Sequence, residues 1–252
     1  MNMYEQYLKF YPGFPKEGVN FVDIIPLMQD KDVFRNLIHD LADQCAAPNI
    51  AAPEARGFLF AAPMLTECPQ IANVIPIRKS GKLPFKEGDL VGVEYMKEYG
   101  PDKLFFRPSD VAAGKMDPDG VFRVTLFDDI LATGGTGSAV AEGLNKTVIT
   151  IDGQPHRIEV TDFVFLVEID GLGGREKLEA LAPVKSLMHL SDERHSERPL
   201  SRFLSLSKES KGEAKESVYV IPRLVRGIFF LHFEKFLKIL LKKLRKNLSG
   251  KK

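Results

Sequence analysis

The 252-residue sequence contains no tryptophan and only two cysteines, Cys45 and Cys68. Two cysteines give neither a metal-binding spacing nor a disulfide framework, which indicates a reducing compartment. No uninterrupted apolar run approaches the roughly 20 residues that span a bilayer, and no basic stretch followed by an apolar core opens the chain. We therefore expect no secretory signal and no membrane span, and we predict a cytoplasmic protein.

The composition is that of a globular protein, with 44% apolar and 27% charged residues. The length suits one α/β domain with additional segments. Ten of the 35 basic residues lie in residues 223–252 beside a single acidic residue, so 25 basic and 33 acidic residues precede them. An acidic body with a basic tail indicates a separate role or origin for the tail.

Residues 124–136 predict an apolar strand, a small-residue loop and a helix start, with Asp128 and Asp129 at the end of the strand. Backbone N–H groups at a helix N-terminus bind phosphate, and glycine lets the backbone approach it. Two carboxylates can accept hydrogen bonds from a vicinal diol or from the water around Mg²⁺. The stretch predicts a ribose 5-phosphate site, and the alternative is an ordinary strand–turn–helix. The residues of the loop are Ala132, Thr133, Gly134, Gly135 and Thr136.

This stretch resembles the phosphoribosyl pyrophosphate (PRPP) motif of type I phosphoribosyltransferases, and it differs from a Walker loop because no Gly-Lys-Ser/Thr follows. The resemblance covers roughly residues 7–190, with gaps at 46–53 and 146–161. It implies an α/β fold with a mainly parallel sheet flanked by helices, in a domain spanning residues 1–190. An N-terminal hood at 10–30 and a mobile lid hairpin at 78–107 would cover the carboxyl ends of the strands.

The hood segment is rich in proline and glycine, and we expect an ordered loop there with one short extended piece. Its pattern Phe-Pro-x-x-Gly-x-x-Phe-x-Asp-Ile, which starts at Phe14, is similar to the hood of the adenine phosphoribosyltransferase family. The resemblance implies that Asn20 and Val22 contact adenine through their backbones and Phe21 through its ring. Family members commonly carry Arg at the position of Val22, so a side-chain closing role is lost here.

Residues 54–60 resemble the pyrophosphate loop of the family, in which a non-proline cis peptide is often reported. The resemblance assigns Arg56 and Gly57 to the leaving pyrophosphate, and the alternative is a helix start with an exposed arginine. The preceding residues 49–52 form a weak strand candidate that Pro53 interrupts, so we expect this edge of the sheet to be thin.

A strand predicted at residues 74–77 leads into a basic, glycine-containing loop. Three cations around a flexible loop can neutralise the charge of a departing pyrophosphate, and the alternative is a solvated basic loop. The resemblance likewise assigns this loop to pyrophosphate. The three cations are Arg78, Lys79 and Lys82.

Residues 90–95 and 104–107 predict a hairpin around Gly100-Pro101. A Glu-Tyr-Gly sequence within it resembles the mobile lid of the family, which implies that Glu98 is an acid/base at the purine and that Tyr99 covers the base. A lid keeps water away from an oxocarbenium-like state. The alternative for both residues is an ordinary solvated turn.

Other elements follow from local patterns. Residues 31–46 predict an amphipathic helix that Asp30 or Asp32 can cap. Asp152-Gly153 predicts a hairpin within residues 147–160, followed by a separate buried strand at 162–169. This hairpin looks like an insertion relative to the family, and its role stays open. Residues 173–178 and 184–190 resemble the closing helix and last strand of the family.

The remaining chain divides into a polar linker at residues 191–217 and a basic helical tail at 218–252. The tail places apolar residues on one helical face and basic residues on the other. Such a helix suits an anionic membrane surface or the groove of a partner protein, and the alternative is a helix that docks on the domain or on a second copy. Its apolar face consists of Phe229, Phe233, Phe236, Leu237, Leu240, Leu241, Leu244 and Leu248.

The resemblance implies an enzyme that converts adenine and PRPP to AMP and pyrophosphate with Mg²⁺, as a homodimer, with Arg56 and Glu98 in catalytic roles. We expect no nucleic-acid partner. One alternative is a phosphoribosyltransferase for hypoxanthine, guanine or xanthine. Another is a PRPP-sensing regulator without turnover, which we would expect to have lost the lid glutamate or the basic loop.

Overall fold

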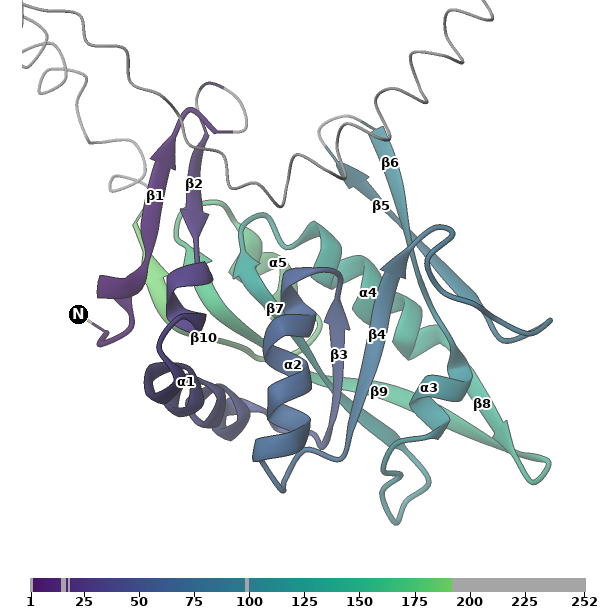
Figure 1. Ribbon diagram of the computed structural model, residues 1–252. Coiled ribbons are helices and arrows are strands. Elements are labelled where there is room, and N and C mark those ends of the chain that lie inside the picture. The colour runs from purple at the N-terminus through teal and green to yellow at the C-terminus, as the bar shows by residue number, and fades with distance from the viewer. Residues whose placement is uncertain (1, 15–16, 18, 98–99, 192–252) are drawn as a thin grey trace, which may run out of the picture. The chain divides into compact units, whose positions relative to one another are not determined.

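The computed structural model describes residues 2–14, 17, 19–97 and 100–191 (Figure 1). The predicted linker beyond Ser191 and the predicted tail at 218–252 lie outside the described residues, as do Glu98 and Tyr99. Among the described residues, no helix is long and apolar enough to cross a lipid bilayer.

The centre of the fold is an eight-stranded sheet with the order β10-β9-β7-β3-β4-β6-β5, to which β8 is joined by pairing with β9. Five strands run parallel: β3 (Asn49–Pro53), β4 (Asn73–Lys79), β7 (Phe122–Leu131), β9 (Gln154–Ile169) and β10 (Val184–Leu190). Three pair antiparallel: β5 (Val91–Lys97), β6 (Gly100–Phe106) and β8 (Val148–Ile151). The predicted mainly parallel sheet is confirmed, and the loops after the parallel strands meet at one edge.

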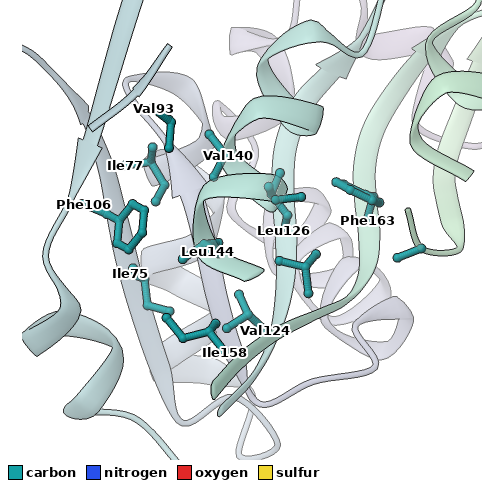
Figure 2. Packing of buried hydrophobic residues seen from close by; sticks show 14 of the residues in the cluster. Ile75, Ile77, Val93, Phe106, Val124, Leu126, Val140, Leu144, Ile158 and Phe163 are labelled. Carbon is teal, nitrogen blue, oxygen red and sulfur yellow. The ribbon is translucent and has the colours of Figure 1, made fainter. Parts of the chain in front are cut away.

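Helices cover both faces of the sheet (Figure 1). On one face, α1 (Lys31–Gln44), α2 (Arg56–Glu67) and η2 (Ile25–Met28) bury apolar side chains in one cluster. On the other face, Val140 and Leu144 of α4 (Gly135–Lys146) join an apolar cluster with Ile75, Ile77 and Leu126 of the sheet, as Figure 2 shows. The short helices are η1 (Glu5–Tyr7), α3 (Pro108–Ala112) and α5 (Gly174–Glu179).

Helix α1 forms as the sequence predicts. The Asp30 carboxylate accepts hydrogen bonds from the backbone N–H groups of Asp32 and Val33, at 3.0 and 3.1 Å. This satisfies two N–H groups that the first helical turn leaves without partners. Leu37 and Leu41, one turn apart, are both fully buried against the sheet.

Strand β3 is central, so the predicted thin edge at residues 49–52 was wrong. β3 pairs with β4 on one side and with β7 on the other, and all five of its residues are buried. Ala51 belongs to the cluster under α4, whereas Ala52 belongs to the cluster under α2. A short strand of small side chains gives a weak sequence signal, but it suits a position with helices on both faces.

The hood segment is a hairpin of β1 (Lys9–Pro12) and β2 (Asn20–Asp23), which corrects the expected loop with one extended piece. Side chains alternate along β2. Val22 is therefore 2% exposed and joins the cluster under α1 and α2, while Phe21 is half-buried on the other side. The position where the family commonly carries Arg is thus part of the core in this chain.

Two further hairpins extend the sheet. Asp152 and Gly153 adopt φ of 52° and 76° between β8 and β9, the left-handed conformation that a tight hairpin turn requires. The second arm of the predicted hairpin at 147–160 and the predicted separate strand at 162–169 form one continuous strand, β9, whose start pairs with β8 and whose remainder pairs with β7. In the lid hairpin, Lys97 pairs with Gly100, so Gly100-Pro101 lies in β6 rather than in the turn.

Candidate active site

Asp128 and Asp129 lie near the carboxyl end of β7, at the edge where the parallel strands end. The Asp129 side chain is 7% exposed, and its Oδ2 lies 2.7 Å from Nε of Arg56. The Asp128 carboxylate accepts a hydrogen bond from the Asp129 backbone N–H at 2.9 Å. Burial, followed by the negative charge of Asp129, raises the pKa of Asp128 well above its usual range. Asp128 is therefore a carboxyl that a cation or a hydroxyl donor would stabilise.

The loop between β7 and α4 has the geometry of an anion site. Gly134 adopts φ of 68°, and α4 begins at the next residue, so the N–H groups of its first turn are directed toward residues 132–134. A Cβ atom at Gly134 would lie 2.9 Å from the Gly174 carbonyl oxygen. A Cβ atom at Gly174 would lie 2.1 Å from the Ala132 carbonyl oxygen. Two backbone segments thus touch here in a way that only glycine permits.

An ion pair fixes the segment that carries Gly174. Arg175 donates from Nε to Glu168 at 2.8 Å, and Ser186 donates to the same carboxylate at 2.6 Å. Burial raises the pKa of Glu168, but Arg175 and Ser186 outweigh it and lower that pKa overall. Glu168 also lies with Asp170 and His189 within 4.8 Å, a spacing that could hold a metal. Because Glu168 is already paired with Arg175, we interpret it as a residue that holds the start of α5 in place rather than as a metal ligand.

The loop after β3 contains a second set of ion pairs. The Glu54–Ala55 peptide is cis, as the resemblance implied. The Glu54 side chain is 5% exposed, and it lies 2.8 Å from Nε of Arg78 and 3.1 Å from Nζ of Lys82. The backbone N–H of Lys79 donates to it as well. Burial raises the pKa of Glu54, but these donors outweigh burial and hold that pKa below its usual range.

An aromatic ring lies beside each of the two arginines. The Arg56 guanidinium carbon is 5.5 Å from the centre of the Phe21 ring, and that of Arg78 is 6.0 Å from the centre of the Phe58 ring. Phe14 meets Phe21 edge to face, with ring centres 5.2 Å apart. The arginine–ring contact connects the hood hairpin to the loop after β3.

The structure thus brings most of the predicted site residues to one edge of the sheet. Arg56 contacts both Asp129 and Phe21, and a Cβ atom at Gly57 would lie 3.4 Å from Asp128 Oδ1. Asn20 lies on β2 beside Phe21, whereas the side chain of Val22 points into the core. Lys79 is exposed at the end of β4. Glu98 and Tyr99 lie outside the described residues, so their predicted roles stay predictions.

Sequence reasoning missed three residues that shape this site: Glu54, Gly174 and Arg175. Glu54 carried a usable signal, because a charged residue directly after a buried strand lies at the same edge as Asp128. The contact of Gly174 with residue 132 joins segments distant in sequence, and no local pattern reveals it.

No family profile matches the chain. It is 37% identical over 185 residues to adenine phosphoribosyltransferase of Clostridium kluyveri, covering 71% of this chain and 93% of the relative. It is 38% identical over 184 residues to adenine phosphoribosyltransferase of Alkaliphilus metalliredigens, covering 72% of this chain and 95% of that protein.

Solved structures give the same result. A structure of adenine phosphoribosyltransferase from Thermoanaerobacter pseudethanolicus matches with a TM-score of 0.60 and 35% identity, covering 74% of this chain and 97% of that one. The Saccharomyces cerevisiae enzyme, in complex with adenine and an imino-altritol bisphosphate, matches with a TM-score of 0.57 and 30% identity, covering 73% of this chain and 95% of that one.

The parallel sheet, the two carboxylates at the end of β7 and the loop at the start of α4 define a type I phosphoribosyltransferase, an enzyme that transfers a phosphoribosyl group. The relatives identify one family within this class, because both are adenine phosphoribosyltransferases and the similarity extends along nearly their whole length. The chain belongs to the adenine phosphoribosyltransferase family.

Proposed function

We propose that this protein transfers the phosphoribosyl group of PRPP to N9 of adenine. The bond between C1 of ribose and the pyrophosphate oxygen breaks, the bond between C1 and N9 forms, and AMP and pyrophosphate are released. The proposal is carried by one juxtaposition at the carboxyl edge of the sheet: Asp128 and Asp129, the latter paired with Arg56, directly precede the loop at the start of α4 that can bind an anion. Family membership gives the same reaction.

At the ribose end, the backbone N–H groups of residues 132–136 hold the 5-phosphate, and the carboxylates of Asp128 and Asp129 accept hydrogen bonds from the ribose diol. Neither group forms a covalent bond with the substrate. Their contribution is to orient C1 between the base and the leaving group, and to do so with dipoles and charges already in place.

At the pyrophosphate end, Arg56, Arg78, Lys79 and Lys82 receive the departing anion beside Gly57. Arginine can donate two parallel hydrogen bonds to phosphoryl oxygens, and lysine adds a compact positive charge. In the structure, Arg56 is paired with Asp129, and both Arg78 and Lys82 are paired with Glu54. Binding therefore requires these cations to exchange or share carboxylate partners.

At the base, the backbones of Asn20 and Val22 and the ring of Phe21 form the hood side of the adenine pocket. Glu98, the proposed acid/base, accepts the proton that N9 loses as the bond to C1 forms, and Tyr99 covers the base from the lid. We expect Glu98→Gln to lower the rate of the chemical step. An effect confined to the KM for PRPP would contradict the acid/base role.

Magnesium fits the donor set of the site. Asp128 and Asp129 offer the carboxylate oxygens that this ion prefers, and the raised pKa of Asp128 marks a carboxyl that a cation would stabilise. These two residues would hold the ion through water and PRPP oxygens. When bound, the ion supplies positive charge to the pyrophosphate. Chelation by EDTA should abolish AMP formation, and added Mg²⁺ should restore it.

We further propose a homodimer, a cytoplasmic location and a membrane-surface or partner-groove role for residues 218–252. The free thiols of Cys45 and Cys68 are consistent with a reducing compartment.

The tail proposal rests on its charge pattern, with ten basic residues against one acidic residue in 223–252. Deletion of residues 218–252 should remove binding to anionic liposomes while AMP formation persists. Equal liposome binding by the truncated protein would refute the membrane role, and sedimentation would test the dimer.

The decisive experiment offers adenine, hypoxanthine, guanine and xanthine separately with PRPP and Mg²⁺, and it measures nucleotide formation. We expect AMP from adenine and no product from the other bases. Product from another base would keep the reaction class but change the substrate. PRPP binding without any product would favour a regulator over an enzyme.

A further inference from the structure

Glu54 is a buried carboxylate that the reaction described above does not use. It follows β3 directly, and three donors from the end of β4 and the following loop converge on it: the side chains of Arg78 and Lys82 and the backbone N–H of Lys79. Both cations are among the four assigned to pyrophosphate. The most buried charged group of this cluster is therefore the Glu54 carboxylate. It contacts two cations that pyrophosphate also has to bind.

We infer that Glu54 is a positioning residue that acts as an internal counter-anion, competing with pyrophosphate for Arg78 and Lys82 and thereby weakening retention of that product. This inference rests on the proposed function, because it takes the assignment of both cations to pyrophosphate from it.

The burial of the three side chains favours competition between Glu54 and pyrophosphate over a purely structural role for Glu54. The Glu54 side chain is 5% exposed, whereas that of Arg78 is 34% and that of Lys82 is 55% exposed. The carboxylate lies below, and the cations keep an outer surface that solvent reaches. A ligand can approach the cations without displacing Glu54 from the loop, so the cations either turn toward the ligand or are shared with it.

The charge balance gives the sign of the effect. Arg78 and Lys82 together with ionised Glu54 carry a net charge of about +1, and removal of the carboxylate charge leaves about +2 facing a polyanion. Glutamine has nearly the same shape as glutamate, and its carbonyl oxygen still accepts a hydrogen bond from Arg78. Glu54→Gln therefore separates charge from shape. We expect it to bind pyrophosphate roughly three- to tenfold more tightly.

A purely structural Glu54 predicts the opposite result. If the carboxylate served only to hold Arg78 and Lys82 in place, its loss would let both side chains wander and would weaken pyrophosphate binding. The direction of the change in affinity therefore discriminates between the two roles.

The test is calorimetry of the full-length chain with magnesium pyrophosphate, supported by the inhibition constant of pyrophosphate in AMP formation. Glu54→Gln should bind more tightly than wild type. Glu54→Asp, which keeps the charge, should stay closer to wild type than Glu54→Gln does. Glu159→Gln removes a carboxylate paired with Arg157 at 3.3 Å on β9, and it should leave the affinity unchanged. Equal or weaker binding by folded Glu54→Gln would overturn the inference.

A measurement on the wild-type chain covers the case in which Glu54→Gln fails to fold. The Nε–H group of Arg78 donates to Glu54 at 2.8 Å. Its proton resonance should shift when magnesium pyrophosphate is added, because Arg78 then shares or changes its acceptor. An unchanged resonance at saturation, or no pyrophosphate binding by wild type, would overturn the inference. The base panel tests the reaction separately, so a failure there is distinguishable from a failure here.

Discussion

The two ends of the active site are built by different means. The phosphate end consists of backbone: Gly134 in a left-handed conformation, the start of α4, and Gly174 packed against the Ala132 carbonyl. The pyrophosphate end consists of charged side chains, with Arg56 on Asp129 and with Arg78 and Lys82 on Glu54. The first end is fixed by close atomic contact, and the second by ion pairs that can exchange partners.

This difference follows the chemistry of the proposed reaction. The 5-phosphate is present in both PRPP and AMP, so its site does not need to change during turnover, and a preorganised backbone cradle suits it. Pyrophosphate must be held and then released. Cations with an alternative carboxylate partner suit that task, because the partner takes over when the product leaves.

The largest expected effect comes from the carboxylates where the two ends meet. Asp128→Asn combined with Asp129→Asn removes the charges proposed to hold the ribose diol and to pair with Arg56. We expect PRPP affinity to fall at least about 100-fold, since hydrogen bonds to charged groups contribute about 1.5–3 kcal/mol each. Calorimetry with PRPP and Mg²⁺ measures this loss.

The matched control for that double substitution is Asp117→Asn with Asp119→Asn. These carboxylates pair with Arg123 at 2.6 and 2.7 Å and take no part in the site. The control should bind PRPP as wild type does. Unchanged turnover in the double variant of residues 128 and 129 would contradict the site assignment.

The next effect tests the backbone-built end alone. In Gly174→Ala the new Cβ atom would lie 2.1 Å from the Ala132 carbonyl oxygen, so the phosphate loop must move. We expect an unfolding free energy lower by about 1–3 kcal/mol and PRPP affinity reduced roughly tenfold. Gly153→Ala is the control: its φ of 76° strains an alanine, but nothing lies within 4 Å. Gly153→Ala should lose stability and keep its affinity for PRPP. Equal PRPP affinity in Gly174→Ala and Gly153→Ala would contradict the proposal that the contact of Gly174 with the Ala132 carbonyl shapes the phosphate loop.

The comparison also shows what the sequence can reveal. The strand, the paired carboxylates and the glycine loop at residues 124–136 are contiguous, and the phosphate end was therefore predictable. The central position of β3 was not, because Ala51 and Ala52 give little strand signal, and their burial depends on helices from distant segments. The partners of the predicted cations were also out of reach. Glu54 directly follows β3 and Arg78 lies near the end of β4, and only the order of the strands in the sheet brings them together.

The smallest expected effect concerns the stability of the unliganded site and its dependence on pH. The pKa of Asp128 is higher in the folded chain than in the unfolded chain, so the folded state binds its proton more tightly. This contribution to stability is fully present below the unfolded pKa and is lost as pH rises through the folded pKa. Asp128→Asn removes that loss, and its unfolding free energy should exceed that of wild type at high pH.

Urea denaturation from about pH 2 to pH 8, a range that includes the unfolded pKa of both carboxyls, measures this difference, and Asp89→Asn provides a control of opposite sign. Burial raises the pKa of Asp89, but hydrogen bonds from Ser109 outweigh it and lower that pKa overall. Asp89 thus stabilises the fold above its unfolded pKa, and the stabilisation is lost as pH falls through its folded pKa. The Asp89→Asn deficit should therefore shrink toward acid, while the Asp128→Asn advantage grows toward base. A stability difference between Asp128→Asn and wild type that stays constant with pH would contradict a raised pKa of Asp128 in the folded chain. The charge of this carboxyl would then matter for substrate binding and not for stability.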